Sequence, residues 1–314
     1  MGVHSGKGVT HPIKKAIKKL IIQTRDYILS LKNEGKEKSG ETHSYDQDDF
    51  AWPWLNSVLV KLVTEGGSTL RPNYAWGVLQ GAHLAKAIGI TRVSVIECGV
   101  AGGNGLISLE NISEKVQEIF DVGIDVYGFD TGTGLPKPVD YRDLPNLWSE
   151  AAFPMDVEKL KSRLRKARLI LGNVEDTVPI FLNSNPAPIS FISFDVDYYS
   201  STMQAFKLLE GDQSLLLPRV HCYFDDILGF TYSDFTGERL AIHEFNASHT
   251  TRTISKIYAL ENYLPKQYVK WVAPEKQYMA HIFDHHLYCR NDGLVKRAFG
   301  GCTDLAEKMR VKEG

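Results

Sequence analysis

The apolar positions of the chain follow two different patterns, one before and one after about residue 90. In the first part they recur at helical spacing in residues 12–32, 52–63 and 72–88, and Pro72 stands at a first-turn position of the last segment. This spacing predicts three helices. The first helix carries lysines on its other face, so it could lie on a membrane, or pack against the domain or a second subunit of a homo-oligomer.

Beyond residue 90, short runs of β-forming apolar residues alternate with helical or irregular segments. The runs predict strands at 93–97, 125–130, 167–171, 189–195 and 220–225. Such alternation is typical of right-handed βαβ units, which form a parallel sheet covered on both faces. Near the end, 267–273 and 277–284 are separated by a short turn and predict an antiparallel hairpin at the sheet edge. We therefore expect a Rossmann-like, doubly wound α/β fold with a mostly parallel seven-stranded sheet, N-terminal helices and a C-terminal hairpin.

The expected organisation has four parts. They are a basic amphipathic helix with a polar linker (1–50), a helical cap (51–90), a Rossmann-like domain (91–290) and a tail (291–314). The formal net charge of −2 gives no global field that would attract nucleic acid. The sequence has no long apolar run, no secretion signal and no paired cysteine spacing, so we expect a cytoplasmic protein without a membrane span or a nucleic-acid partner.

The stretch VSVIECGVAGGNG, residues 93–105, leads from a predicted strand into a glycine-rich turn. A dinucleotide site prefers G-x-G-x-x-G with an acid about twenty residues later, whereas here the next strand-end acid, Asp130, lies 31 residues past Gly99. Glu97, just before the first glycine, suits a ligand with a cationic centre, because charges attract more strongly in a partly desolvated cleft. S-adenosylmethionine carries a sulfonium and an ammonium. The turn therefore favours this ligand, while a dinucleotide, or a tight turn without a ligand, stays an open alternative.

Two further strand ends carry residues that suit the same ligand. Asp130 is placed to accept hydrogen bonds from both hydroxyls of a ribose, although a strand-end aspartate can also cap a helix. The loop that begins at Thr131 could close over the ribose. The segment 172–174, after the third strand, could hold an adenine ring.

Aspartates follow two neighbouring strands of the predicted sheet. Asp195 follows the fourth strand, and Asp225 and Asp226 follow the fifth. The side chains can converge, because adjacent strands lie about 5 Å apart, but the aspartate pair can act together only if the chain leaves the sheet there. Three converging carboxylates repel one another unless they are protonated or bound to a cation, and oxygen ligands select Mg²⁺. The alternative is that Asp197 caps the next helix and that the other aspartates accept hydrogen bonds from loop amides.

Five short motifs of the chain belong together. They are E-x-G-V at 97–100, F-D-x-x-x-G-L-P at 129–136, G-x-x-x-x-T-x-P at 172–179, D-x-D-x-Y-x-S-T-M-x-A at 195–205 and the aspartate pair at 225–226. This set resembles the macrocin O-methyltransferase family, which comprises bacterial class I enzymes related to sugar O-methyltransferases of macrolide biosynthesis. The likeness covers about residues 93–245. Val196 stands where the family has a glycine and Ser200 where it has a glutamate, so the acceptors of known members are not carried over.

The resemblance implies an S-adenosylmethionine-dependent O-methyltransferase that transfers a methyl group to a hydroxyl of a small molecule, such as a sugar or a natural-product glycoside. It implies a Mg²⁺ ion bound by Asp195, Asp225 and Asp226, and donor contacts in the turn after β-forming residues 93–97. Together with the strand ends above, the expected donor-site residues are Glu97, Gly99, Val100, Ala101, Gly102, Gly103, Asp130, Thr131, Gly172, Asn173, Val174 and Asp195.

The acceptor hydroxyl needs a group that takes its proton, because a free hydroxyl is a poor nucleophile. Asp195 and His243 are the candidates, and His243 could equally be an ordinary helix histidine. The aromatic and acidic segment 141–154 is either a lid that excludes water or a surface loop. An NAD-dependent oxidoreductase and a non-catalytic Rossmann-like binding protein remain the alternative functions.

Overall fold

The computed structural model describes residues 52–67, 70–229 and 232–289. The predicted helix 12–32, the linker after it and the tail 291–314 lie outside these residues, so the four-part division of the chain stays a prediction. The helix α2, Trp52–Gly66, and the helix α3, Pro72–Ala87, agree with the helices expected from the apolar spacing.

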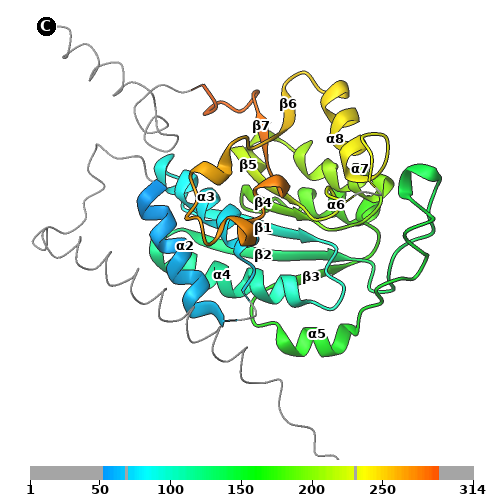
Figure 1. Cartoon of the computed structure of the whole chain (residues 1–314), viewed down its shortest axis with the longest axis horizontal. Helices are drawn as coiled ribbons and strands as arrows, with labels where there is room; N and C mark the ends of the chain where they lie inside the picture. The colour runs from blue at the N-terminus through cyan, green and yellow to red at the C-terminus, as the bar shows by residue number, and fades with distance from the viewer. Residues whose placement is uncertain (1–51, 68–69, 230–231, 290–314) are drawn as a thin grey trace, which may run out of the picture. The chain divides into compact units, whose positions relative to one another are not determined.

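The described residues form one seven-stranded sheet in the order β3-β2-β1-β4-β5-β7-β6 (Figure 1). All neighbouring pairs are parallel except those of β7, which runs antiparallel to both β5 and β6. The strands are β1 Arg92–Cys98, β2 Gly123–Asp130, β3 Arg168–Leu171, β4 Ile189–Phe194, β5 Leu216–Phe224, β6 Arg252–Lys256 and β7 Gln277–Ile282. The predicted Rossmann-like, mostly parallel sheet with a C-terminal antiparallel pair is confirmed.

The antiparallel pair, however, is not built as predicted. The apolar residues of 267–273 form a short helix, α9 (Val269–Val272), rather than a strand. Instead, β7 pairs with β6, which comes before it in the chain. In the sheet, β7 lies between β5 and β6. Residues 257–276 thus connect the two strands through 3-10 turns at Leu260–Asn262 and Pro274–Lys276. The error arose because a short apolar run has the same composition in a buried helix turn and in a strand.

Helices cover both faces of the sheet, which explains why the central strands β1 and β4 are mostly apolar and almost completely buried. Helices α2, α3 and α4 (Asn104–Phe120) pack on one face, together with α5 (Val157–Arg163) and α9. Helices α6 (Val174–Asn183), α7 (Tyr199–Ala205) and α8 (Gly237–Ser248) pack on the other. The two groups are seen on opposite sides of the strands in Figure 1. Every residue of β4 is buried.

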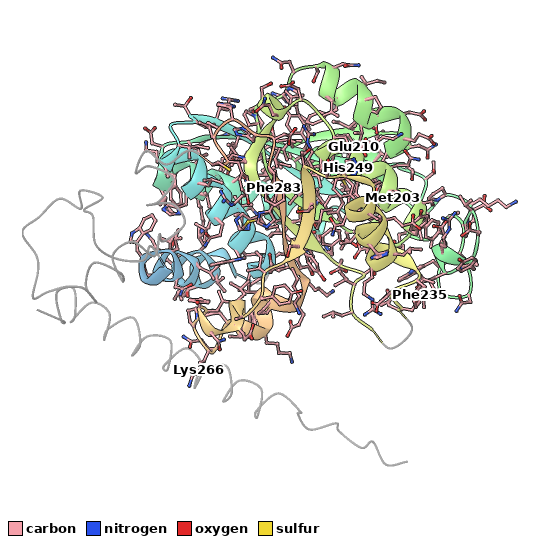
Figure 2. The ribbon with its side chains drawn as sticks, turned by 90° about the horizontal axis from the view of Figure 1, so that it is seen from above. Met203, Glu210, Phe235, His249, Lys266 and Phe283 are labelled. Carbon is pink, nitrogen blue, oxygen red and sulfur yellow. The ribbon has the colours of Figure 1, made fainter. Side chains whose placement is uncertain are left out.

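Contacts at the two ends of α8 fasten this helix to its neighbours. At its C-terminus, His249 stacks on Phe245, and Nε2 of His249 lies 3.5 Å from a carboxylate oxygen of Glu210 (Figure 2). At its N-terminus, the buried Glu238 accepts a hydrogen bond of 2.9 Å from the backbone N–H of Asp226. The second contact joins α8 to the loop that follows β5, and so to the site described next.

Candidate functional site

A cavity of about 590 Å³ opens at the carboxyl edge of the sheet, over the ends of β1 to β5. The strand order reverses between β1 and β4, and ligands of open α/β sheets bind at such a switch point. The residues predicted for the donor and the metal ion all line this cavity: Glu97, Gly99, Val100, Ala101, Gly102, Gly103, Asp130, Thr131, Gly172, Asn173, Val174, Asp195, Asp225 and Asp226. The sequence motifs therefore come together in one place.

Two glycines, Gly99 in the turn after β1 and Gly105 in the first turn of α4, allow the close packing on which the cavity depends. Gly99 has a φ of 85°, and a Cβ there would lie 1.7 Å from the carbonyl oxygen of Asp195. A Cβ at Gly105 would lie 1.7 Å from Oε1 of Glu97. No other residue fits at either position without moving the backbone at Asp195 or the carboxylate of Glu97.

Glu97 lies beneath the glycine turn and is 1% exposed. The hydroxyl of Tyr74 donates a hydrogen bond of 2.8 Å to its Oε1, while Oε2 is buried without a partner. Burial raises the pKa of Glu97 to about 8, even though Arg71 and Tyr74 act in the opposite direction. The carboxyl group thus takes up a proton at neutral pH unless a cationic group enters the cavity beside it.

Two residues at the start of α3 belong to the site, although the sequence analysis did not find them. Arg71 Nη1 donates a hydrogen bond of 2.8 Å to the hydroxyl of Tyr74 and lies 3.9 Å from a carboxylate oxygen of both Glu97 and Asp195. Ser193 of β4 donates to the same hydroxyl at 2.8 Å. The available signal was the Arg-Pro dipeptide: a residue before proline is extended, so Arg71 stands at the helix N-terminus instead of entering the helix.

Asp130 connects the end of β2 with the glycine turn. Its Oδ2 accepts hydrogen bonds of 2.9 Å from the backbone N–H groups of Val100 and Ala101, and its Oδ1 accepts one of 2.7 Å from Gly132. A carboxylate has about four acceptor positions, so these bonds leave about one. The predicted contact of Asp130 with the hydroxyls of a ribose stays a prediction. In the loop after Asp130, the hydroxyl of Thr131 donates a hydrogen bond of 2.6 Å to the carbonyl of Gly134.

Asp195, Asp225 and Asp226 offer carboxylate oxygens that lie within 4.8 Å of one another. Asp195 directly follows β4, and its N–H donates to the carbonyl of Cys98 at 2.9 Å. The chain leaves the sheet after Phe224, the last residue of β5, as a joint role of Asp225 and Asp226 requires. Among the residues that the structure describes, no other group of three such side chains has this geometry.

The three carboxyl groups differ in their pKa values. Burial and the two neighbouring aspartates raise the pKa of Asp195 to about 7, and burial and Asp225 raise that of Asp226 to about 6. Burial also opposes ionisation of Asp225, but hydrogen bonds from Tyr223 and Lys276 outweigh it and lower the pKa of that carboxyl. The oxygen Oδ2 of Asp226 is buried without a partner. An all-oxygen group with an unpartnered buried oxygen fits a hard divalent cation.

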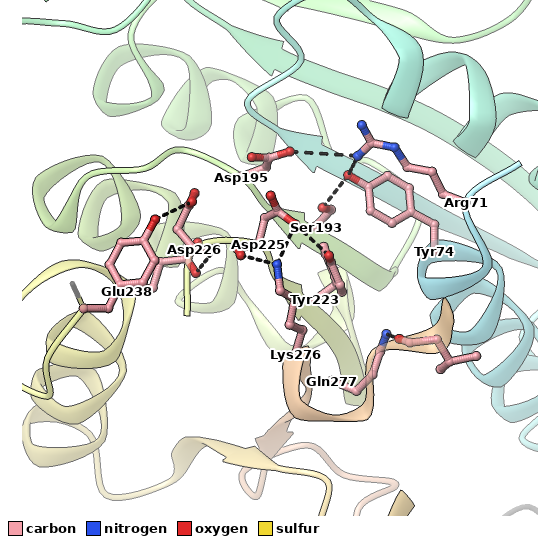
Figure 3. A network of polar contacts seen from close by, with 12 residues as sticks. Arg71, Tyr74, Ser193, Asp195, Tyr223, Asp225, Asp226, Glu238, Lys276 and Gln277 are labelled. Carbon is pink, nitrogen blue, oxygen red and sulfur yellow. Dashed lines mark hydrogen bonds and ion pairs between the residues drawn. The ribbon is translucent and has the colours of Figure 1, made fainter. Parts of the chain in front are cut away.

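Lys276, a second cation that the sequence analysis missed, lies beside Asp225 (Figure 3). Its Nζ is 3.0 Å from Oδ1 of Asp225, and the hydroxyl of Tyr223 donates to the same oxygen at 2.7 Å. Tyr223 belongs to β5, and Asp225 comes directly after the last residue of this strand, so the hydroxyl and the carboxylate meet at the strand end. Lys276 comes directly before β7 and reaches Asp225 because β7 pairs with β5. The predicted hairpin did not include this pairing.

Asp197 does not cap the helix α7, contrary to the alternative that the sequence left open. It is buried at a φ of 59° and lines the cavity beside the three aspartates, where burial and Asp226 raise its pKa to about 8. Asp143 of the loop after β2 contacts the start of α7 instead. Its carboxylate accepts hydrogen bonds from the N–H and the hydroxyl of Ser200, at 2.8 and 2.9 Å.

The segment 135–153 forms the outer wall of the cavity. Fully buried Asp143 also accepts a bond of 2.8 Å from the N–H of Val139, which fixes the wall to α7. The wall presents Val139, Trp148 and Phe153 to the cavity, and the last two rings meet edge to face with their centroids 6.0 Å apart. The side chain of Phe153 is 51% exposed, which is a large apolar area to leave in water.

His243 is the one predicted site residue that the structure does not bring to the cavity. It is exposed on α8 and is absent from the cavity lining. Asp195 is thus the better placed of the two predicted proton acceptors.

In the part of the chain that the structure describes, each helix is too short or too polar to cross a membrane. The described cysteines, Cys98, Cys222 and Cys289, are free thiols.

Comparison with known proteins gives similarity in fold only. No protein-family model and no curated protein sequence matches the chain. Among solved structures, the calicheamicin methyltransferase CalS11 is 21% identical, with a TM-score of 0.41 over 67% of this chain and 91% of CalS11. The O-methyltransferase NovP is 16% identical, with a TM-score of 0.39 over 49% of this chain and 64% of NovP, less than two thirds of its length. The apo form of CalS11, named a TDP-rhamnose 3'-O-methyltransferase, is 20% identical, with a TM-score of 0.33 over 66% of this chain and 90% of that chain. Likenesses of this size do not decide a function, which has to be argued from the residues of the cavity.

Proposed function

We propose that this protein is an S-adenosylmethionine-dependent O-methyltransferase that binds Mg²⁺ and methylates a hydroxyl group of a small molecule. One observation carries the proposal. The same cavity is lined on one side by the turn that contains Glu97 and on the other by the cluster of Asp195, Asp225 and Asp226. The first side suits a cationic methyl donor and the second a hard cation. An NAD-dependent oxidoreductase has no need for the second side, and a non-catalytic binding protein has little reason to keep like charges together.

On the donor side, S-adenosylmethionine supplies a methyl group on a positively charged sulfur. The unpartnered Oε2 of Glu97 supports a nearby cationic ligand, because a buried acceptor without a donor costs free energy that a ligand can recover. Asp130 keeps about one acceptor position, which suits one ribose hydroxyl. Gly172, Asn173 and Val174, at the end of β3, would contact the adenine.

On the acceptor side, Asp195, Asp225 and Asp226 would hold Mg²⁺, which lowers the pKa of a hydroxyl bound to it. Asp195 lies between the glycine turn and the aspartate pair, so it is the group best placed to take the proton of the acceptor. Arg71 lies 3.9 Å from Asp195 and would keep that carboxylate oriented.

The wall of the cavity supports an acceptor with an apolar part. Val139 and Phe153 are exposed side chains of the wall, and covering them with a ligand is favourable by roughly 25 cal/mol for each Å² of apolar surface. Cations that could bind a phosphorylated acceptor are few along the lining: Lys137, on the wall, and Arg71, already shared between two carboxylates. We therefore infer a neutral acceptor, such as a glycoside with an apolar aglycone or a phenol. A homo-oligomer formed through the N-terminal helices and a cytoplasmic location remain predictions.

Calorimetric titration with S-adenosylhomocysteine and with NAD, each with and without Mg²⁺, tests the proposal. We expect S-adenosylhomocysteine to bind and NAD not to bind. Turnover on a panel of glycosides and phenols should require Mg²⁺, be abolished by a chelator and be lost in Asp225→Ala. Binding of NAD without binding of S-adenosylhomocysteine would overturn the methyltransferase assignment. Chelator-resistant turnover that Asp225→Ala leaves unchanged would remove the cation from the mechanism.

A further inference from the structure

A positively charged side chain, that of Lys276, contacts Asp225 on the side that faces away from the cavity. Lys276 Nζ is 3.0 Å from Oδ1 of Asp225 and also donates to the backbone carbonyl of the same residue at 2.5 Å. The side chain of Lys276 is 20% exposed and does not line the cavity, whereas Asp225 does. The ammonium therefore reaches the carboxylate cluster from behind and leaves the cavity side of Asp225 open to a ligand.

The backbone fixes the position of Lys276. Tyr223 pairs with Gln277 in the antiparallel ladder of β5 and β7, so Lys276 lies beside the end of β5. The amide of the fully buried Gln277 donates to the carbonyls of Asn73 and Val272, at 3.1 and 2.9 Å, and joins this turn to α3 and α9. Lys276 thus cannot move far from Asp225 without breaking contacts of buried groups.

The charge of the cluster explains why a lysine is held there. The acids Asp197 and Glu238 are buried beside this cluster, and burial together with the charges of the three aspartates raises the pKa of each of them. Among the described residues, two cations form ion pairs with members of the cluster: Arg71 with Asp195 and Lys276 with Asp225. Each lies on a different member of the group, and they come from opposite ends of the described chain.

We propose that Lys276 is an internal counter-ion of the carboxylate cluster, which stabilises the cluster while no divalent cation is bound and lowers its affinity for such a cation. This inference rests on the proposed metal site. The lysine is a positioning and charge-balancing residue, because it contacts a proposed metal ligand and lies outside the cavity. Because the ammonium of Lys276 and the divalent cation would compete for Asp225, the divalent cation would bind reversibly.

The sign of the effect follows from the contacts of Asp225. Loss of the ammonium removes its repulsion of a bound divalent cation. Loss of the ammonium also makes the net charge of the cluster more negative, and both changes strengthen binding of the cation. The opposing effect is loss of orientation, and outer partners of metal ligands are typically worth about 10- to 100-fold in affinity. The Tyr223 hydroxyl, at 2.7 Å from the same oxygen, remains to orient Asp225 when Lys276 is replaced. Removal of the charge should therefore dominate.

The experiment is calorimetric titration of the metal-free full-length protein with Mn²⁺ alone. We expect Lys276→Met and Lys276→Gln to bind Mn²⁺ at least about 10-fold more tightly than wild type, and Lys276→Arg to bind it with the wild-type affinity. Tyr223→Phe, which removes a hydrogen bond but no charge, should bind it about 10-fold more weakly. Lys270→Met is the matched control: it removes the same charge from an exposed position on α9, and its affinity should not change.

The outcomes separate this inference from the function on which it rests. If the wild type and all variants fail to bind Mn²⁺, the metal site itself is wrong. If the wild type binds Mn²⁺ but Lys276→Met and Lys276→Gln bind it equally or more weakly, the site stands and the counter-ion role is overturned. Thermal unfolding of each metal-free variant checks that the fold is kept. Lys276→Gln retains a hydrogen-bond donor, so it serves if the methionine variant does not fold.

Discussion

The hydroxyl of Tyr74 donates a hydrogen bond of 2.8 Å to Oε1 of Glu97, and this contact joins α3 to the end of β1 beneath the proposed donor site. Both residues are fully buried, so neither can replace the bond with one to water. The helix that the sequence analysis assigned to a separate cap thus supplies a direct partner of the first motif residue.

Tyr74→Phe should reduce the free energy of unfolding by about 1 to 3 kcal/mol, because the variant leaves the buried Glu97, Arg71 and Ser193 without the hydroxyl that connects them. Urea unfolding measures the change. Tyr258→Phe is the control, since that ring is mostly exposed and should have almost no effect. Equal stabilities of wild type and Tyr74→Phe would contradict a structural role for this contact.

Asp143→Ala should loosen the wall of the cavity. The carboxylate accepts three hydrogen bonds, two from Ser200 and one from Val139, so its loss frees the wall from α7 and leaves these donors unpaired. We expect faster cleavage by a protease within 144–153 and a loss of stability of about 1 to 3 kcal/mol. Limited proteolysis followed by mass spectrometry identifies the cut. Asp140→Ala, which removes a more exposed carboxylate of the same loop, is the matched control.

The sequence predicted the fold and the lining of the cavity because both depend on local patterns. The residues of β1 and β4 are mostly apolar, and all of them except Arg92 are buried, which is typical of a strand covered on both faces. The turn after Glu97 and the acids after Phe194 and Phe224 follow these strands directly. Parallel strands bring their carboxyl ends to the same edge, so order along the chain was enough to predict that the motifs meet.

The side chains that contact these motif residues are placed by long-range packing, so no local sequence pattern predicts them. Arg71 precedes the sheet and Lys276 follows most of it, and each reaches the site only through the packing of α3 and the insertion of β7. The apolar run 269–272 looked like a strand because composition does not distinguish a short buried helix from a strand. His243 was proposed because it follows the aspartate pair in sequence, but the turn of α8 exposes it.

The raised pKa values predict that metal-free protein loses stability as the pH rises. The pKa values of Asp195 and Glu97 are about 7 and about 8 in the folded protein, compared with about 4 in an unfolded chain. Between these values the folded state binds protons that the unfolded state lacks. The contribution of these two groups to stability is therefore fully present below about pH 4 and is lost as the pH rises through about 7 and 8.

Saturating Mg²⁺ should reduce this pH dependence, because a cation bound to the aspartates replaces their protons. Urea unfolding at about pH 5.5, 7 and 8.5, with and without Mg²⁺, measures both effects. Asp225 has a lowered pKa and contributes in the opposite sense, but only at acidic pH. Metal-free stability that increases between about pH 6 and 8 would contradict the protonated carboxyl groups.

Phe153→Ala should weaken the binding of the acceptor and leave the donor site intact. The ring is half exposed in the cavity, packs edge to face on Trp148 and belongs to the wall that Asp143 fixes to α7. Losing the contact of an aromatic side chain with a ligand costs about 1.5 to 3 kcal/mol, so KM for the best acceptor should rise roughly 10- to 100-fold. The affinity for S-adenosylhomocysteine, measured by calorimetry, should stay within about twofold. Phe235→Ala is the control, because that ring is also exposed but does not line the cavity (Figure 2). A loss of S-adenosylhomocysteine binding with unchanged KM for the acceptor would instead assign Phe153 to the nucleoside.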